Sequence, residues 1–206
     1  RGGVHASDRT PRGLAVVRTR WTRVVVSLRM RVERLRPDHA GAVLTFEREN
    51  REYFARSVPD RGDAYFVEFD QRHRSLLAEQ DAGLHHFHVI VDGGGAVIGR
   101  VNLIDIKDGV AELGYRVAER AAGRGLAKAA VAKVCQLAAA TYGLTGLTAV
   151  TTLDNPASRA VLEGNGFVAV REIRIDGRPG VRYERSLVSA EHGGHETGEA
   201  GGVVVE

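Results

Sequence analysis

The chain has 206 residues, the length of one domain with short extensions. Hydrophobic residues make up 43% and charged residues 27%, which excludes a wholly disordered, collagen-like or coiled-coil chain. The formal net charge is +3, and the single cysteine excludes a disulfide scaffold or a zinc module with several cysteine ligands. No stretch reaches the ~18 apolar residues needed to span a membrane, so we expect a soluble protein without membrane contact. The single cysteine fits a reducing compartment, so we expect the protein to be cytoplasmic.

The charge is unevenly distributed along the chain. Residues 1–29 contain seven arginines and one aspartate, whereas residues 189–206 contain four glutamates and no lysine or arginine. This leaves only +1 on residues 30–188. Because the basic excess lies outside the expected folded part, the sequence does not favour nucleic-acid binding.

Both ends are expected to lie outside the folded domain. The chain starts at Arg1, its only methionine is Met30, and residues 1–29 have no sustained period of 2 or 3.6 residues. We interpret residues 1–29 as a disordered or non-native leader; the alternative, an arginine-rich targeting arm, lacks a cleavage site and an apolar core. Residues 189–206 are expected to be a flexible, acidic, glycine-rich tail. The domain is therefore expected over residues 30–188.

The first part of this domain predicts one strand and then helices. Residues 30–35 alternate apolar and charged side chains, which is typical of a half-buried strand. Residues 37–54 are expected to be helical, with a proline at the favoured first position. A segment rich in Pro, Asp and Gly, 59–63, breaks the helix. A second helix is expected over 64–80, with one face formed by Phe66, Phe69, His73, Leu76 and Leu77.

The second part predicts strands around one long helix. Strands are expected over 86–91 and 96–106, joined by a turn at 92–95, and then over 110–117. The long helix is expected over 124–142, with a buried stripe of Leu126, Ala130, Val134, Leu137 and Thr141. The last elements are a strand over 147–152, a short helix over 156–163 and a hairpin. The hairpin has strands over 167–175 and 181–187, joined by a turn at 176–180. This order predicts a mixed α/β sheet, parallel where the long helix crosses over.

A glycine-rich turn precedes the long helix, with the sequence Ala122-Gly123-Arg124-Gly125-Leu126-Ala127-Lys128. Free backbone N–H groups and the positive end of the helix dipole make such a turn an anion site, suited to a phosphate or pyrophosphate. Gly123 and Gly125 let the backbone approach the ligand closely. The turn is not a dinucleotide fingerprint, because Lys128 stands where the third glycine would be, and it has no Walker lysine motif.

Motifs on both sides make this turn specific. Glu112-Leu113-Gly114-Tyr115-Arg116-Val117 precedes it, and Asn155-Pro156-Ala157-Ser158 and then Gly166-Phe167 follow it. With this ordered set the chain resembles the GNAT superfamily of N-acetyltransferases over about residues 30–188, most strongly over 110–168. Within the superfamily the motifs are similar to those of the ribosomal-protein-alanine N-acetyltransferase branch. The resemblance implies the GNAT fold, a mostly antiparallel sheet of about seven strands with one splayed parallel pair and flanking helices.

The resemblance also implies acetyl-CoA as co-substrate. Members of the family bind the pyrophosphate of acetyl-CoA on a loop with the pattern Gln/Arg-x-x-Gly-x-Gly/Ala. In this chain the three defining positions of the loop are Ala122, Gly125 and Ala127. Ala122 departs from the usual Gln or Arg, so we expect weaker anchoring but not loss of binding. The residues expected to bind the co-substrate are Val117, Ala118, Glu119, Ala122, Gly123, Arg124, Gly125, Leu126 and Ala127, with Asn155 fixing the pantetheine arm or the thioester.

Acetyl transfer needs a neutral amine and a proton for the departing thiolate. Glu112 is the candidate base, acting through a water, although it could instead only pair with a neighbour on the sheet. Many family members place a tyrosine acid where this chain has Leu162, so Ser158 is the candidate acid; the alternative is that Ser158 only caps its helix. Backbone N–H groups near Val117 are expected to stabilise the oxyanion. Tyr115 is interpreted as a packing residue.

The remaining candidates carry no expected chemistry. Cys135 lies in the middle of the long helix and is expected to be a buried, inert thiol. His85, His86 and His88 would be split between two faces by strand alternation, and two further histidines lie in the expected tail. We therefore expect no metal site.

The expected activity is direct transfer of an acetyl group to a primary amine in a ternary complex. The acceptor is either the α-amino group of a protein N-terminus, such as that of a ribosomal protein, or a small amine such as an antibiotic or a polyamine. The missing tyrosine and Ala122 leave an alternative: a GNAT-like module that binds an acyl-CoA or a protein without turnover. The protein is expected to be a monomer or a homodimer.

Overall fold

Seven strands form one sheet in the order β1-β2-β3-β4-β5-β7-β6 within residues 30–188, the part of the chain that this computed structural model describes. Every neighbouring pair is antiparallel except β4 and β5, which run parallel. The strands are β1 (Arg31–Arg34), β2 (His86–Val91), β3 (Val97–Lys107), β4 (Val110–Val117), β5 (Gly146–Thr152), β6 (Val168–Ile175) and β7 (Arg178–Ser186). The mixed α/β fold is confirmed, and the expectations for 1–29 and 189–206 lie outside the described residues.

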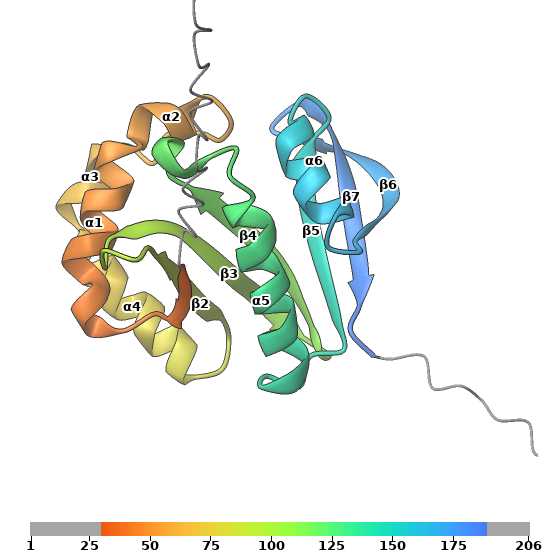
Figure 1. Ribbon diagram of the computed structural model, residues 1–206, viewed down its shortest axis with the longest axis horizontal. Coiled ribbons are helices and arrows are strands. Elements are labelled where there is room, and N and C mark those ends of the chain that lie inside the picture. Colours follow the sequence, from red (N-terminus) through yellow and green to blue (C-terminus); the bar gives the residue numbers. More distant parts are fainter. Residues whose placement is uncertain (1–29, 189–206) are drawn as a thin grey trace, which may run out of the picture.

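Helices cover both faces of the sheet (Figure 1). The α-helices are α1 (Ala40–Glu49), α2 (Arg51–Ala55), α3 (Asp63–Val67), α4 (Phe69–Asp81), α5 (Leu126–Ala140) and α6 (Pro156–Glu163), with short 3₁₀ turns at Pro37–His39 and Glu119–Ala121. Glu47 of α1 contacts Arg100 on β3, whereas Tyr142, just after α5, contacts His88 on β2. Arg100 and His88 lie on opposite faces because His88 pairs with Val101, the next residue along β3. Helices α1 and α5 therefore cover opposite faces.

The helical stretch expected over 37–54 is a 3₁₀ turn followed by α1 and α2, which are separated at Asn50. Three further expected elements differ from the structure. The helix expected over 64–80 is two helices, interrupted at Glu68, where the backbone has φ −91° and ψ 11°. Next to the break, Tyr65 packs edge-to-face against Phe69, at 5.8 Å between ring centroids, with Arg61 over the Tyr65 ring. The turn expected at 176–180 is the two-residue turn Asp176–Gly177, with φ of 49° and 79° at its two residues. Positive φ at both positions matches the twist of a tight hairpin, so β7 starts early.

The long helix is also shorter than expected. It begins at Leu126, because Gly125 has a left-handed φ of 74° and serves as the N-cap. Leu126, Ala130 and Val134 are buried as expected, but the stripe continues through Ala138 while Thr141 is exposed. With 3.6 residues per turn, the position below Val134 is residue 138.

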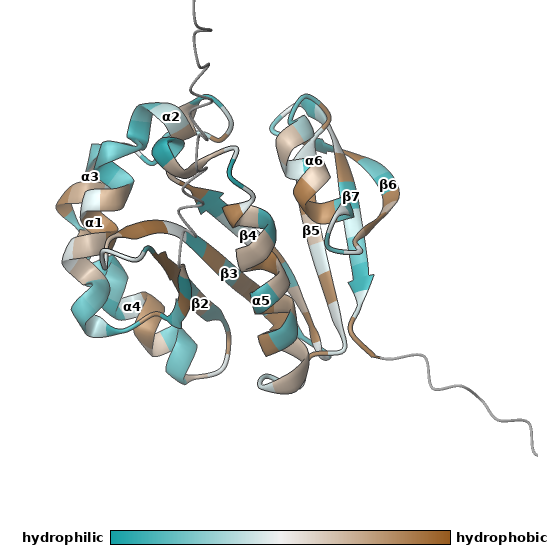
Figure 2. Cartoon of the chain, in the orientation of Figure 1, coloured by the Kyte–Doolittle hydropathy of each residue, from teal (hydrophilic) through white to brown (hydrophobic). Residues whose placement is uncertain are grey.

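The apolar core lies between the sheet and the helices, whose outer faces are polar (Figure 2). The parallel strands β4 and β5 interrupt this regular packing, because they pair only at Val110–Glu112 with Gly146–Thr148 and then separate. Ala118 N–H donates to the Ile98 carbonyl at 2.9 Å, so alternation turns the backbone groups of Tyr115 and Val117 toward β5, where no strand meets them. The separation thus creates an open backbone edge in the middle of the sheet.

Candidate active site

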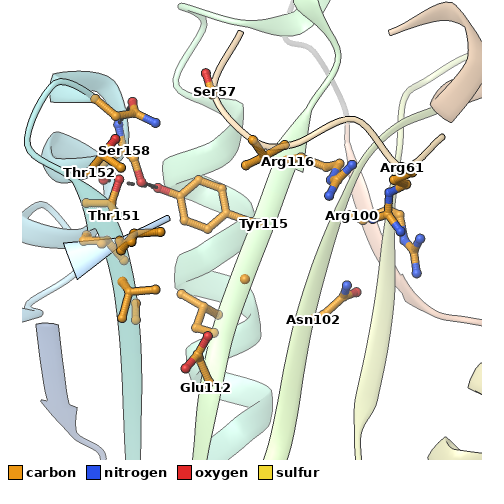
Figure 3. Close-up of a pocket in the computed structure, with 18 residues that line it drawn as sticks. Ser57, Arg61, Arg100, Asn102, Glu112, Tyr115, Arg116, Thr151, Thr152 and Ser158 are labelled. Carbon is orange, nitrogen blue, oxygen red and sulfur yellow. Dashed lines mark hydrogen bonds between the residues drawn. The ribbon is translucent and has the colours of Figure 1, made fainter. Parts of the chain in front are cut away.

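A cleft of about 330 Å³ opens where β4 and β5 separate. Both strands line it, together with α6, two residues of β3 and the segment between α2 and α3 (Figure 3). On the β5 side, Leu153 N–H donates to the Pro179 carbonyl of β7 at 3.0 Å, which turns the backbone groups of Val150 and Thr152 toward the cleft. A ligand with its own amide groups can therefore pair with both walls in the manner of an added strand.

The glycine-rich turn lies between β4 and α5. Within the described chain, the N–H groups of residues 123–128 donate no hydrogen bond, and the first helical bond runs from Ala129 N–H to the Gly125 carbonyl at 3.0 Å. The turn is exposed, with Gly123 and Gly125 both at positive φ, 70° and 74°. Free N–H groups at the start of a 15-residue helix are the arrangement that binds anions in other proteins, and an anion site at this turn stays a prediction.

Three of the residues expected to contact the co-substrate have N–H groups that are already occupied. Ala118 N–H donates to Ile98, Ala122 N–H donates to the Glu119 carbonyl at 3.1 Å, and Glu119 N–H donates to the Asn50 side-chain oxygen at 2.9 Å. These hydrogen bonds fix the path of the chain from β4 to the turn. Among the residues expected to bind the co-substrate near this turn, the free N–H donors are therefore those of Val117 and of residues 123–127.

Asn155 and Ser158 are brought together at the start of α6. The Ser158 N–H donates to Asn155 Oδ1 at 3.0 Å, so Asn155 is the N-cap of the helix and Ser158 is not. The Ser158 hydroxyl is thus not needed as a cap. Both residues line the cleft, as does buried Leu162 one turn further on.

Tyr115, interpreted from sequence as a packing residue, contacts Ser158 across the cleft. The two hydroxyl oxygens lie 2.9 Å apart, and the Tyr115 hydroxyl also lies 3.1 Å from the Ser158 carbonyl, to which it can donate (Figure 3). Burial raises the pKa of Tyr115, while the hydrogen bond to Ser158 opposes the shift. The phenol therefore keeps its proton at neutral pH. The sequence signal for this pair was the tyrosine in the Glu-x-Gly-Tyr motif.

Glu112 also lines this cleft, and its side chain leaves β4 on the face opposite to that of Tyr115. It lies opposite Ile104 on β3 and Thr148 on β5, and it forms no ion pair with any described residue. Because Glu112 and Tyr115 are three positions apart on a strand, their side chains leave on opposite sides. A carboxylate and a hydroxyl pair thus flank the point where β4 and β5 separate.

A group of arginines that the sequence did not reveal borders the cleft beside α1. Glu47 is only 2% exposed, and its carboxylate lies 3.3 Å from Arg100, 3.1 Å from Arg116 and 3.7 Å from Arg61. Burial lowers the pKa of Arg116, the nearby positive charges of Arg61 and Arg100 lower it further, and Glu47 opposes them. We call Glu47, Arg61, Arg100 and Arg116 the arginine cluster; three positive charges share one buried carboxylate.

The other candidate residues lie away from the cleft. Cys135 is buried, and burial raises the pKa of its thiol, which matches the expected inert state. Among the described residues, no group of histidine, cysteine, aspartate and glutamate side chains is arranged to hold a metal ion. None of the helices within 30–188 is long and apolar enough to cross a membrane.

A mixed seven-stranded sheet with one splayed parallel pair, and a glycine-rich turn with free N–H groups before the helix that joins that pair, is the arrangement of the GNAT acetyltransferase fold. The family model described as an acetyltransferase (GNAT) domain matches residues 29–168, so the chain belongs to this family. The predicted family, fold and enzyme class are therefore confirmed. No curated protein sequence matches the chain.

Solved structures extend this comparison. The ribosomal-protein-S5-alanine acetyltransferase of Vibrio fischeri has a TM-score of 0.72 and 22% identity, over 76% of this chain and 92% of that one. RimJ of Mycobacterium smegmatis, in complex with CoA-disulfide, has a TM-score of 0.69 and 22% identity over 76% and 81%. The spermidine N-acetyltransferase of Vibrio cholerae, in complex with CoA and spermine, has a TM-score of 0.63 and 18% identity over 77% and 95%. These likenesses support the fold.

Proposed function

We propose that this protein transfers the acetyl group of acetyl-CoA to a primary amine within a ternary complex, in the cytoplasm. The observation that carries the proposal is the open backbone edge of β4 and β5, which begins beside Glu112 and leads to the free N–H groups of the turn. The amide groups of the pantetheine arm would pair with the cleft walls, and the pyrophosphate would bind to residues 123–127. On the α6 side, the Asn155 side chain would hold the pantetheine arm or the thioester, because the helix cap uses only its Oδ1 atom.

The chemistry follows from the two sides of the cleft. The amine nitrogen attacks the thioester carbonyl carbon, and a backbone N–H near Val117 stabilises the negative oxygen that forms. The carbon–sulfur bond then breaks, leaving an amide and a thiolate. Glu112, through a water, accepts the proton that the amine loses, and the Ser158–Tyr115 hydroxyl pair donates a proton to the sulfur. The products are an N-acetyl amide and free CoA.

For the acceptor we propose either the α-amino group of a protein N-terminus or a small amine. Both kinds occur among the structural neighbours, one of which acts on a ribosomal-protein alanine and another on spermidine. The motif pattern of the β4 and α6 segments favours the first.

The test is acetyl transfer with the full chain. Free CoA thiol is measured after mixing acetyl-CoA with N-terminal peptides and small amines, and the acetylated product is identified by mass. We expect thiol release that depends on the acceptor. Tight CoA binding with no transfer to any amine would instead assign the protein as a binding module without turnover.

A further inference from the structure

The side of the cleft beside α1, where we place the acceptor amine, carries an excess of positive charge. Arg61, Arg100 and Arg116 all line the cleft, and Glu47 is the one carboxylate within 4 Å of them in the described chain. Arg61 is 34% exposed, while Arg100 is only 5% exposed. A single carboxylate offsets one of three charges, so the cluster retains about two positive charges beside a hollow that a ligand can enter.

Two buried polar atoms in this part of the cleft have no partner. Arg100 Nε and Asn102 Oδ1 are both without a hydrogen bond in the described chain. Both residues line the main cleft and also a second hollow of about 190 Å³, between the sheet and the α1, α3 and α4 helices. Buried polar groups of proteins are nearly always hydrogen-bonded, so an unpaired guanidinium nitrogen in a residue that lines two hollows points to a polar ligand in this part of the cleft.

Strand geometry relates this cluster to Glu112. Glu112, Gly114 and Arg116 alternate onto one face of β4, with Asn102 and Arg100 beside Gly114 and Arg116 on β3. A Cβ at Gly114 would meet nothing within 4 Å, so the floor between Glu112 and Arg116 is open. Four residues of a strand span about 13 Å, the length of a peptide of three or four residues.

We propose that the acceptor amine carries an anionic group, a carboxylate or a phosphate, which binds to Arg61 and Arg100 while the amine lies beside Glu112. The acceptor lies across Gly114, with its anionic group against the guanidinium groups of Arg61 and Arg100 that line the cleft. This inference rests on the proposed acetyl transfer. It identifies the preferred acceptors as amines with an acidic end, and it makes polyamines poor acceptors, because their second cation would lie against the arginine cluster.

A purely structural role does not account for the cluster. One guanidinium can pair with both oxygens of a carboxylate, so burying Glu47 requires one arginine rather than three. Arg61 also lies in the segment between α2 and α3 and stacks on Tyr65 at 4.5 Å, which holds its guanidinium at the mouth of the cleft.

The test compares acceptors that differ only in charge. The peptides Ala-Glu-Ala-Ala, Ala-Gln-Ala-Ala and Ala-Lys-Ala-Ala, all with amidated ends, are assayed for kcat/KM, together with a second set that has the variable residue at position three. A small-molecule arm compares 6-aminohexanoate with hexylamine and spermidine. We expect the acidic member of at least one set to exceed its neutral partner by about tenfold and the cationic member to be the poorest. The arm with the larger ratio identifies the source of the anion, a protein N-terminus or a free amino acid.

Two variants connect this preference to the cluster. Arg61→Met removes the most exposed guanidinium and leaves Glu47 paired with Arg100 and Arg116, so the fold is retained. We expect the acidic-to-neutral ratio to fall to about two or less. The matched control is Arg48→Met, which makes the same charge change on the exposed side of α1 and should keep the wild-type ratio.

The outcomes separate the two proposals. Acetylation of neutral and acidic acceptors at equal kcat/KM in every set would overturn the anion proposal while leaving acetyl transfer intact. A preference that Arg48→Met abolishes as well as Arg61→Met would also overturn it, because the effect would then come from overall charge. Absence of transfer to every acceptor, with CoA still bound, would contradict the proposed function itself.

Discussion

Glu112 and Tyr115 belong to one short motif but act, in the proposed mechanism, on opposite sides of the reacting carbonyl. Their three-residue spacing on β4 sends one side chain toward the arginine cluster and the other toward α6. The amine and the leaving sulfur therefore meet different groups. This division allows the base and the acid to be tested separately.

Glu112→Gln removes the proposed base and keeps the size of the side chain. We expect kcat at pH 7 to fall by about 10²-fold with little change in acetyl-CoA affinity. Activity should recover as the pH rises, because the free amine then no longer needs a base. The measurement is kcat from pH 6 to 9, and a parallel decrease at every pH would contradict this role for Glu112.

Ser158→Ala and Tyr115→Phe each remove one hydroxyl of the pair. We expect each to lower kcat by about 10–10³-fold, and the double variant to be only slightly worse than the more severe single variant, because hydroxyls 2.9 Å apart act as one unit. Steady-state kinetics of the four proteins gives the coupling. Fully additive losses would show that the two hydroxyls act independently.

His88 is a buried histidine whose two ring nitrogens are both satisfied. Nδ1 donates to the Val101 carbonyl at 3.1 Å, so Nε2 accepts from the Tyr142 hydroxyl at 2.8 Å. Burial lowers the pKa of His88 to about 4. The folded state therefore resists protonation that the unfolded chain accepts below pH ~6.5, and stability is lost as the pH falls from there toward 4.

We predict that the free energy of unfolding depends less on acid pH when His88 is replaced. Between pH 7 and 5, His88→Gln should lose about 2 kcal/mol less free energy of unfolding than the wild type. Urea titrations at the two pH values measure this difference directly. Any constant loss from repacking cancels, so equal pH slopes would show that His88 does not titrate as described.

At the scale of elements, α5 connects the two halves of the sheet, and its N-terminus carries the proposed anion site. Its buried face packs on β3 and β4, and the N–H groups that follow the left-handed Gly125 donate no hydrogen bond in the described chain. The buried residues are Leu126, Ala130, Val131, Val134, Cys135 and Ala138. A Cβ at Gly125 would meet nothing within 4 Å, so a side chain there would extend toward the ligand.

Gly125→Asp and Gly125→Asn test this site as a matched pair. Both residues tolerate a left-handed φ better than other side chains, and they differ only in charge. We expect Asp to weaken CoA binding about tenfold more than Asn does, because a carboxylate would face the pyrophosphate. Calorimetry with CoA measures both, and equal affinities would place the phosphates elsewhere.

At the scale of the whole molecule, residues 30–188 contain the described hydrophobic core and all seven described strands. The first strand, β1, pairs along its length with β2, and β7 continues to Ser186 beside β5. The folded unit is thus held together by contacts among these residues.

A protein of residues 30–188 should therefore fold by itself. We expect its Tm to lie within about 3 °C of the full chain, a difference of about 1 kcal/mol at this size, and its kcat/KM to be unchanged. Thermal unfolding followed by circular dichroism and the acetyl-transfer assay provide the comparison. A much lower Tm would show that the terminal segments contribute to the fold.

The sequence by itself determined the order of the elements, the glycine-rich turn and the family. These features depend on local periodicity, on glycines that allow positive φ, and on short motifs, all of which can be read from neighbouring residues. For the same reason the motifs predicted Asn155 and Ser158 as site residues, and the structure places both at the cleft. The sequence did not predict the break at Glu68 or the short Asp176–Gly177 turn. Both concern where an element begins or ends, and tertiary packing shifts these boundaries away from the local preference of the residues.

The tertiary structure alone decided which distant side chains meet. Tyr115 and Ser158 are 43 positions apart, and Glu47 lies 53 positions from Arg100 and 69 from Arg116. Such pairs leave no periodic signal, because each partner taken alone is an ordinary tyrosine, glutamate or arginine. Their contacts arise only when β4 separates from β5 and α1 packs on β3. The sequence thus determined the family and the glycine-rich turn, while long-range packing determined the Tyr115–Ser158 hydroxyl pair and the arginine cluster beside the cleft.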